Sequence, residues 1–365
     1  SAVWTGFSSI ILGDNYYMKK KILFIVPSMR GGGAERVMLT LLKHLPREQF
    51  ELSLALVERV GPYLSELPND VTVFDLDTGR VRYAVPKIIR LVNRIKPDIV
   101  FSTLGHLNIA LIISQIFWKH SASLIIREGT VVSTQNSILA NGVVWNYLYR
   151  RYYPKANRII CQSIAMADDL NIEFKIPQSR TFTIYNPIDL DYIDSLTDGK
   201  NPFPIGVGPN IVAIGRLARE KAFDKLIKAF PSLLLKHHGA QLWILGEGPL
   251  LNDLKYLSTQ LKIEERVRFV GFQANPYTWM AYADLFVLSS AYEGLPNVLL
   301  EAMACGCPVV SLEHPGGTRE IFEITGQLDR YVKELTWEDK WFEKPSPEVR
   351  YRLEEYFGLE KVIAQ

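Results

Sequence analysis

The sequence predicts an α/β protein of two domains, each a parallel β-sheet with helices on both sides. Its 365 residues are long for one domain and comfortable for two. Short apolar runs, typical of strands buried on both faces, alternate with helical patterns. A stretch rich in Pro, Gly and Asp at residues 197–209 separates two such series and predicts a linker. We therefore expect two sheets with a ligand-binding cleft between them.

The first series begins with the apolar run 22–26, followed by a glycine loop and a helix over about 34–45. We expect further strands at residues 52–57, 71–75, 99–102, 123–126 and 158–162. Helical patterns lie at residues 85–95, 107–118, 138–152 and 164–170. Residues 182–185 then lead into Asn186-Pro187-Ile188-Asp189.

The second series restarts at residue 211, with strands expected at 211–215, 241–245, 267–270, 285–288 and 308–311. The predicted domains are residues 18–185 and 186–345, with a closing helix over about 346–365 that returns to the first domain. Residues 1–17 lack the basic and apolar regions of a signal peptide and are excluded from the predicted fold.

The composition of the chain is that of a globular protein. Apolar residues make up 48% of the chain and charged residues 22%, which favours globular domains over disorder. Up to Lys175 there are 21 Lys and Arg against 14 Asp and Glu, and after it 20 against 25. This asymmetry indicates a polar partner or an anionic surface, with chance as the alternative. Three cysteines are too few for a disulfide framework and fit a reduced cytosol, and no run approaches the ~20 apolar residues of a membrane-spanning helix.

The most informative segment covers residues 293–301 and pairs two carboxylates, Glu293 and Glu301. Glu293 is expected on a loop, and Glu301 in the second or third turn of the apolar helix that follows. Pro in the first turn suits a helix start. Two carboxylates on one loop–helix unit can accept hydrogen bonds from sugar or ribose hydroxyls. The turn between them consists of Gly294, Leu295, Pro296 and Asn297.

Two glycine-containing turns upstream of residue 293 follow predicted strands and also suit ligand binding. The strand ending at Gly215 is followed by Arg216 and Lys221, and the strand 241–245 is followed by Gly246 and Gly248. Loops at the carboxyl ends of parallel strands are where open α/β sheets bind ligands. Two fixed cations there suit a diphosphate, since Arg binds phosphate oxygens as a fork and Lys as a point charge.

Together these motifs resemble the donor half of GT-B glycosyltransferases, and more narrowly the retaining family 4. The resemblance covers roughly residues 21–322, and its specific part is the donor half: Gly215-Arg216-Leu217 with Lys221, Gly246-Glu247-Gly248-Pro249 and the paired glutamates. The run Gly31-Gly32-Gly33-Ala34-Glu35-Arg36 resembles the subgroup that builds surface polysaccharides and lipid-linked glycans. The implied fold is GT-B, two Rossmann-like domains. After Ile321 the sequence departs from the family pattern.

The resemblance implies roles in transfer from a nucleotide-diphosphate sugar. Arg216 and Lys221 would offset charge on the leaving diphosphate, Glu301 would accept from the ribose hydroxyls, and Glu293 would contact the donor sugar. Backbone amides near the donor would come from Gly294 and Leu295. The full set of expected donor-binding positions is Gly32, Gly33, Gly215, Arg216, Lys221, Gly246, Gly248, Glu293, Gly294, Leu295, Pro296, Asn297 and Glu301. Gly32 and Gly33 also have a plain structural reading, as a helix-opening turn.

The first domain offers weaker candidates. His106 follows the strand 99–102 in a loop where the family often has a functional His, so we expect it beside the reacting centre or, equally, as a loop or core histidine. Arg127 and Glu128 end the next strand, where relatives often carry a further His that this chain lacks. Glu128 is a candidate for orienting the acceptor hydroxyl. Glu320 is a weaker candidate, with helix capping as its alternative.

No required cofactor or metal is expected. Two Asp-x-Asp triplets, Asp75-Leu76-Asp77 and Asp189-Leu190-Asp191, could ligate a divalent ion, but neither lies near the donor motifs in sequence. The donor is expected to be a UDP-sugar and the acceptor a saccharide carried on a lipid.

Basic and aromatic residues at 145–155 and 85–96 suit a membrane–water boundary, or else a core face with a solvated rim. We expect a cytoplasmic enzyme with peripheral contact at the inner face of the membrane, and no nucleic acid partner. A transferase with a small soluble acceptor and an inactive sugar-nucleotide-binding protein are the alternatives.

Overall fold

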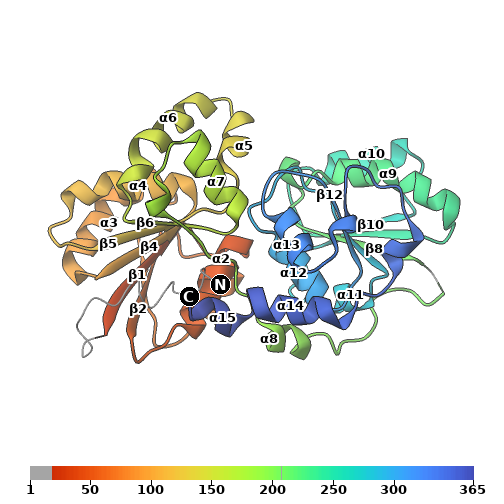
Figure 1. The fold of residues 1–365 in the computed structure, drawn as a ribbon, viewed down its shortest axis with the longest axis horizontal. Helices are drawn as coiled ribbons and strands as arrows, with labels where there is room; N and C mark the ends of the chain where they lie inside the picture. Colours follow the sequence, from red (N-terminus) through yellow and green to blue (C-terminus); the bar gives the residue numbers. More distant parts are fainter. Residues whose placement is uncertain (1–18, 207) are drawn as a thin grey trace. The chain divides into compact units, whose positions relative to one another are not determined.

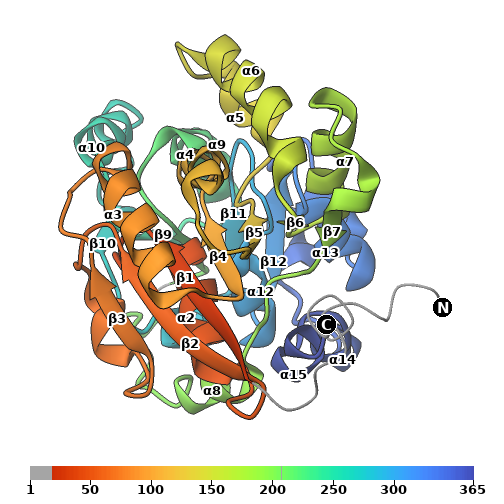
Figure 2. The ribbon, with the colours of Figure 1, turned by 90° about the vertical axis from the view of Figure 1, so that its left-hand side faces the viewer.

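The computed structural model describes residues 19–206 and 208–365, so the prediction for residues 1–17 lies outside the described part of the chain. The chain divides into two compact units: one runs up to Pro187 and includes Glu360–Gln365, and the other is Ile188–Leu359. Each unit is built on one parallel sheet flanked by helices (Figures 1 and 2). The predicted fold class, α/β with two Rossmann-like parallel sheets, is confirmed.

The sheet of the first unit has seven strands in the order β3-β2-β1-β4-β5-β6-β7. All neighbouring strands pair in parallel. From β1 the chain first builds toward β3, then crosses back to β4 on the other side, so the order reverses between β1 and β4. The strands are β1 (Lys20–Val26), β2 (Phe50–Leu56), β3 (Thr72–Asp75), β4 (Ile99–Thr103), β5 (Ser123–Arg127), β6 (Arg158–Cys161) and β7 (Thr181–Thr183).

Strand β1 shows why these segments are strands. Leu23 and Ile25 belong to the core on one face of the sheet, whereas Ile22, Phe24 and Val26 belong to the core on the other face. Successive side chains of a strand point to opposite faces, so a strand covered on both sides must be apolar at nearly every position. This is the pattern from which the strand was predicted.

The helices of the first unit cover both faces of its sheet (Figure 1). Residues of α2 pack on the face of Phe24, and residues of α3, α4 and α7 on the face of Leu23. The helices are α2 (Gly33–His44), α3 (Val81–Ile95), α4 (Gly105–Ser114), α5 (Val132–Ser137), α6 (Gly142–Tyr152), α7 (Ile164–Glu173) and α15 (Leu359–Ile363).

The helix expected over residues 138–152 begins later than predicted. Helix α5 ends at Ser137, a short turn follows, and α6 starts at Gly142. A Cβ at Gly142 would lie 1.9 Å from the backbone oxygen of Asn136, so only glycine allows this close approach of the two helices. The boundary is set by a contact between α5 and α6 that hydrophobic periodicity does not reveal.

The sheet of the second unit has six strands in the order β10-β9-β8-β11-β12-β13, again all parallel. Here the order reverses between β8 and β11. The strands are β8 (Asn210–Ile214), β9 (Gln241–Leu245), β10 (Val267–Gly271), β11 (Leu285–Leu288), β12 (Val309–Leu312) and β13 (Tyr331–Val332). Its helices are α8 (Leu190–Ser195), α9 (Phe223–Lys236), α10 (Leu251–Gln260), α11 (Tyr277–Tyr282), α12 (Asn297–Ala304), α13 (Thr318–Ile324) and α14 (Pro347–Phe357).

The sequence departs from the family pattern after Ile321. This segment adds the edge strand β13 to the sheet. Strand β13 pairs with β12 through Ser311 and Tyr331. Trp337 and Trp341, both buried, then fill the core beside α9. The last part forms two helices where one closing helix was expected: α14 groups with the second unit and contacts α12, whereas residues 360–365 group with the first unit.

Candidate functional site

A cation and a carboxylate meet where the strand order of the second unit reverses. Strands β8 and β11 are hydrogen-bonded neighbours whose following loops lead to opposite parts of the sheet. In open α/β sheets such a reversal opens a crevice at the carboxyl ends of the strands, where ligands bind. The ammonium of Lys221, on the loop after β8, lies 2.5 Å from Oε1 of Glu293, on the loop after β11. Ser290 donates a hydrogen bond to the same carboxylate oxygen, at 2.6 Å.

Backbone contacts hold these two loops together independently of the ion pair. The N–H of Ala291 donates to the carbonyl of Glu220 at 2.8 Å, and the Ser289 hydroxyl donates to the carbonyl of Lys221 at 2.9 Å. Between Gly215 and α9 the chain forms a loop and a short 3₁₀ turn, Arg219–Lys221. The backbone around Lys221 is thus held to the loop after β11 by one main-chain bond and one side-chain bond.

The glycines after β9 are required by close packing against the loop after β8. A Cβ at Gly246 would lie 2.0 Å from the backbone oxygen of Gly215, and one at Gly248 2.4 Å from that of Leu217. Leu217 donates to the carbonyl of Glu247 at 2.9 Å. Gly215, Gly246 and Gly248 therefore lie together, as the motif pattern predicted, and their first function is to let two backbones touch.

The loop of Glu293 rests on a third loop, after β12, that the sequence analysis did not single out. The N–H of Glu293 donates to the carbonyl of Pro315 at 3.1 Å, and that of Gly317 donates to the carbonyl of Gly294 at 2.7 Å. Gly316 has a φ of +125°, and a Cβ on it would lie 1.7 Å from the backbone oxygen of Glu293. The Pro-Gly-Gly triplet at 315–317 was the available sequence signal.

Helix α12 carries the rest of the paired-glutamate motif. It starts at Asn297, directly after Pro296, and Glu301 lies in its second turn as predicted. Leu295 and Pro296 are buried beneath the loop. Arg216, by contrast, is exposed, and its side chain forms no ion pair within the described ranges 19–206 and 208–365.

Two buried polar atoms near Glu293 have no hydrogen-bond partner among the described residues. They are Nε2 of His314 and Oγ1 of Thr318, which flank the loop after β12. Burial of the ring lowers the pKa of His314, so the neutral form is favoured. Buried polar groups are normally paired, and these two atoms can still bond to a polar group that reaches the end of β12. His314 carries no functional signal in the sequence.

In the first unit, the predicted residues also lie at the point where the strand order reverses, between β1 and β4. Gly32 and Gly33 follow β1 and begin α2, and both are exposed. His106 lies in the first turn of α4, directly after β4, and is exposed. Partial desolvation of its imidazole ring lowers the pKa of His106.

Arg127 and Glu128, the two acceptor-side candidates, are 3% and 2% exposed. Glu128 accepts hydrogen bonds from the Tyr153 hydroxyl and from Nδ2 of Asn108, the latter at 3.1 Å. Burial raises the pKa of Glu128 to about 7, although these bonds oppose the shift. Asn108 also donates to the carbonyl of Arg127 at 3.0 Å, which ties the end of β5 to the helix that carries His106.

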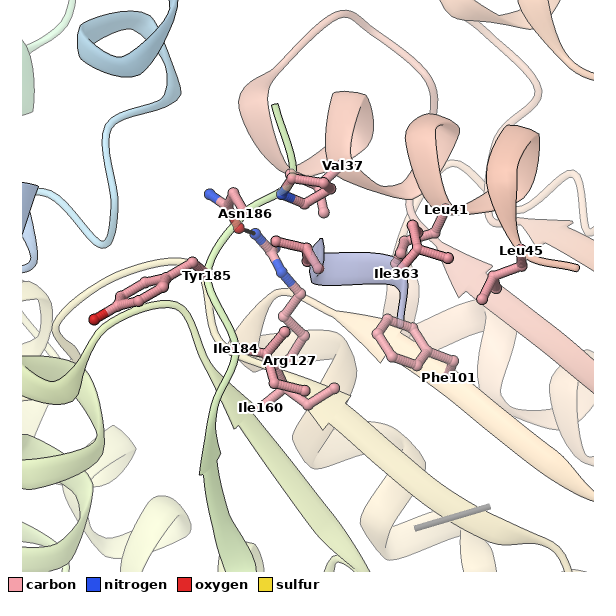
Figure 3. A pocket seen from close by; sticks show the side chains of 12 residues that line it. Val37, Leu41, Leu45, Phe101, Arg127, Ile160, Ile184, Tyr185, Asn186 and Ile363 are labelled. Atoms are coloured by element: carbon pink, nitrogen blue, oxygen red, sulfur yellow. Dashed lines mark hydrogen bonds between the residues drawn. The ribbon is translucent and has the colours of Figure 1, made fainter. Parts of the chain in front are cut away.

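Arg127 points to the other face of its sheet, into a small and mainly apolar pocket (Figure 3). Its guanidinium donates to Oδ1 of Asn186 at 2.6 Å and to Oγ1 of Thr103 at 3.3 Å. Desolvation lowers the pKa of Arg127 to about 10. Leu41 and Ile363 stand across the pocket from it. In this arrangement the Arg127 side chain supports the segment leading to Asn186.

Neither Asp-x-Asp triplet gathers further ligands. Within residues 19–206 and 208–365 there is no group of three or more His, Cys, Asp or Glu side chains placed to hold a metal ion. In the same part of the chain no helix combines the length and apolarity needed to cross a bilayer. Cys161, Cys305 and Cys307 are free thiols.

Two Rossmann-like domains, each with a parallel sheet, define the GT-B class of fold, and solved structures match it. The structure of Anabaena HepE in complex with UDP and glucose has a TM-score of 0.74, with 19% identity over 94% of this chain and 97% of the other. The structure of WaaG, a glycosyltransferase of lipopolysaccharide biosynthesis, has a TM-score of 0.70, with 15% identity over 94% of this chain and 98% of the other.

Sequence comparison places the chain in a family. The model of glycosyltransferase family 4 matches residues 31–192, and that of glycosyl transferases group 1 matches residues 202–332. One relative, the N-acetylgalactosamine-N,N'-diacetylbacillosaminyl-diphospho-undecaprenol 4-alpha-N-acetylgalactosaminyltransferase of Campylobacter jejuni, is 33% identical over 84% of both chains. The chain belongs to glycosyltransferase family 4 and is a glycosyltransferase, as the motifs predicted.

Proposed function

We propose that this glycosyltransferase transfers a sugar from a UDP-sugar, with retention of anomeric configuration, to a hydroxyl of a lipid-linked saccharide in cell-envelope glycan synthesis. The observation that carries the proposal is the Lys221–Glu293 ion pair at the reversal between β8 and β11. The pair supports the proposal because an ammonium that could bind phosphate lies beside a carboxylate that could accept from sugar hydroxyls.

The donor would be held as follows. The exposed guanidinium of Arg216 and the ammonium of Lys221 bind the diphosphate oxygens, and Glu301 on α12 accepts from the ribose hydroxyls. Glu293 contacts the hydroxyls of the sugar. Because Lys221 is paired with Glu293 in this structure, the diphosphate would share the ammonium with that carboxylate.

Negative charge builds up on the leaving diphosphate in the transition state. These residues would lower the activation barrier by stabilising that charge. Fixed donors aimed at developing charge are usually the largest contribution to catalysis, and losing one costs ~10²–10³ in rate. In the first unit, the backbone at Gly32 and Gly33 and the ring of His106 are proposed to contact the transferring sugar. Arg127 and Glu128, being buried, would support these elements from beneath.

Two relatives support the choice of donor and acceptor. The Campylobacter jejuni relative is named for a diphospho-undecaprenol-linked saccharide, and Anabaena HepE was crystallised with UDP. A relative from Rhizobium meliloti, a lipopolysaccharide core biosynthesis glycosyltransferase that is 33% identical over 45% of this chain and 46% of its own length, fits the same branch of metabolism. Peripheral contact with the membrane would follow from a lipid-linked acceptor.

The test is a transfer assay with purified full chain, a panel of UDP-, GDP- and ADP-sugars, and diphospho-undecaprenol-linked saccharides or their soluble analogues. The product's anomeric configuration is read by NMR. We expect transfer from a UDP-sugar with retention, and a loss of ~10²–10³ in kcat/KM for Arg216→Ala. The matched control is Arg219→Ala, an exposed arginine three residues along the same loop. Binding of nucleotide without turnover on any acceptor would instead identify an inactive sugar-nucleotide-binding protein.

A further inference from the structure

An exposed apolar surface lies at the junction of α5 and α6 in the first unit. We call it the α5–α6 tip, and it consists of Ile138, Leu139, Val143, Val144 and Tyr147. Val143 is 84% exposed and Tyr147 63%. Figure 2 shows α5 and α6 at the outer end of the first unit, projecting beyond its sheet. Five large apolar side chains exposed within ten residues form a patch of the kind that marks an interaction site.

The tip is held in a defined shape by the packing beneath it. Gly142 allows α6 to start against the backbone of Asn136, and Nδ2 of Asn136 donates to Oδ1 of Asn146 at 2.9 Å. Asn136 is 3% exposed, so this bond is shielded from water. The turn is closed by the N–H of Gly142, which donates to the carbonyl of Leu139 at 3.0 Å. The apolar side chains are therefore presented by a fixed helical hairpin.

The formal charges within the hairpin and the turns beside it are of one sign. Residues 129–167 contain no Asp or Glu and four basic residues. Three of these, Arg150, Arg151 and Lys155, are exposed and follow the tip along α6 and the turn after it. At 1.5 Å per residue, Arg151 lies about 10 Å along the helix from Val144.

The acidic side chains of the neighbouring helix α7 do not cancel this pattern. Asp169 accepts the N–H of Ser133 at 3.1 Å, within the hairpin base. Arg150 donates to the backbone carbonyl of Glu173, at 3.1 and 3.2 Å, and no ion pair joins the two side chains in the described part of the chain. Asp168 is exposed on α7. Among the residues of the hairpin itself, all formal charge is positive.

We infer that the α5–α6 tip inserts into the surface of an anionic lipid bilayer, with Arg150, Arg151 and Lys155 at the level of the headgroups. Interfacial helices bury their apolar face about 5–10 Å into the headgroup–acyl boundary, which matches the spacing between tip and basic residues. Arg and Lys with long stems suit that boundary, and anionic lipids attract them. The inference deepens the proposed function, since a lipid-linked acceptor lies at such a surface.

The experiment is vesicle flotation with purified full chain, in the absence of donor and acceptor. Vesicles contain either phosphatidylglycerol with phosphatidylethanolamine or phosphatidylcholine alone. We expect partition to the anionic vesicles only, weakened at least tenfold in the combined variant Val143→Ser, Val144→Ser, Tyr147→Ser. Arg151→Gln with Lys155→Gln should weaken it roughly fivefold for each charge removed, and added salt should weaken it further. The control is Leu235→Ser, an exposed leucine of the second unit at 78% exposure.

Unchanged melting temperatures show that the variants fold. Partition of the tip variant equal to that of the wild type overturns the inference, as does a wild-type dimer in solution that the tip variant dissociates, because the tip would then bind a second copy. Transfer to a soluble acceptor separates the two proposals. If the tip variant keeps that activity and loses vesicle binding, both stand, whereas vesicle binding by a chain without transfer activity leaves the insertion in place and removes the proposed function.

Discussion

Nζ of Lys221 lies 2.5 Å from Oε1 of Glu293, and the two residues follow neighbouring strands, β8 and β11, at the reversal of the strand order. Both side chains are largely buried, at 21% and 14% exposure. The pair thus joins the two loops that frame the crevice of the second unit. It also keeps the ammonium at the site where a diphosphate would need it.

Removing the ammonium tests its role in transfer. We predict that Lys221→Ala lowers kcat/KM by ~10²–10³, because a fixed cation facing the leaving diphosphate is lost. The backbone bonds between Ala291 and Glu220 remain, so the fold should persist. Steady-state kinetics with a UDP-sugar measure the effect. Lys228→Ala, which removes an exposed lysine from α9, serves as the control, and equal activity of the two variants would exclude Lys221 from the site.

The loop after β12 should be intolerant of side chains at Gly316. A Cβ there would meet the backbone oxygen of Glu293 at 1.7 Å, so Gly316→Ala must displace the Glu293 loop. We predict a loss of about 3 kcal/mol in the free energy of unfolding together with loss of nucleotide binding. Gly326→Ala is the matched control, because Gly326 also has a positive φ but no atom within 4 Å of the added Cβ. It should cost only about 1–2 kcal/mol, and similar losses for both would refute the close-approach argument.

The buried carboxyl of Glu128 should make stability depend on pH. Its pKa is raised from 4.5 to about 7 by burial, so the folded state binds a proton that the unfolded state releases between these values. Stability contributed by the protonated form is complete below pH 4.5 and is lost as the pH rises to 7. The loss is about 3 kcal/mol. Arg127, Tyr149, Tyr153 and Cys161 are charged or titratable groups that interact electrostatically with Glu128.

Urea unfolding at pH 5 and pH 8 measures this dependence. We expect Glu128→Gln, which keeps an oxygen to accept from Tyr153, to remove most of the decrease in unfolding free energy between the two pH values. Glu51→Gln, an exposed glutamate of the same unit, should leave it unchanged. A decrease that persists undiminished in Glu128→Gln would assign the pH dependence to another group.

Much of the fold could be predicted because its strands are buried on both faces. Runs such as Ile22–Val26 within β1 must then be apolar at every position, and the second sheet repeats this at Leu285–Leu288. The start of α6 was missed because Gly142 is required by contact with Asn136, and periodicity carries no information about contacts between helices. The grouping of residues up to Leu359 with the second unit likewise rests on contacts that periodicity does not reveal.

The candidate site was predictable where a motif is contiguous and not where it is assembled from distant loops. The turn after Glu293 and the second-turn position of Glu301 follow from local spacing. His314 and Gly316 reach Glu293 only because β12 lies beside β11, a relation set by strand order. The residues adjacent to Glu128 in the sequence do not indicate its burial. Asn108 and Tyr153, which donate hydrogen bonds to it, are distant in the sequence.

The central claim is that the crevice at the β8–β11 reversal binds a uridine diphosphate sugar, and thermal shift measures this most directly. Wild type, Glu301→Ala and the exposed control Glu264→Ala would be melted with UDP, GDP, ADP or no ligand. A ligand at 100 times its Kd stabilises by about 2.7 kcal/mol, and a unit of this size gains roughly 2–4 °C in Tm for each kcal/mol. We predict that UDP alone raises the Tm of wild type and Glu264→Ala and leaves the Tm of Glu301→Ala unchanged. The absence of any nucleotide-dependent shift in wild type, or a full UDP shift in Glu301→Ala, would contradict it.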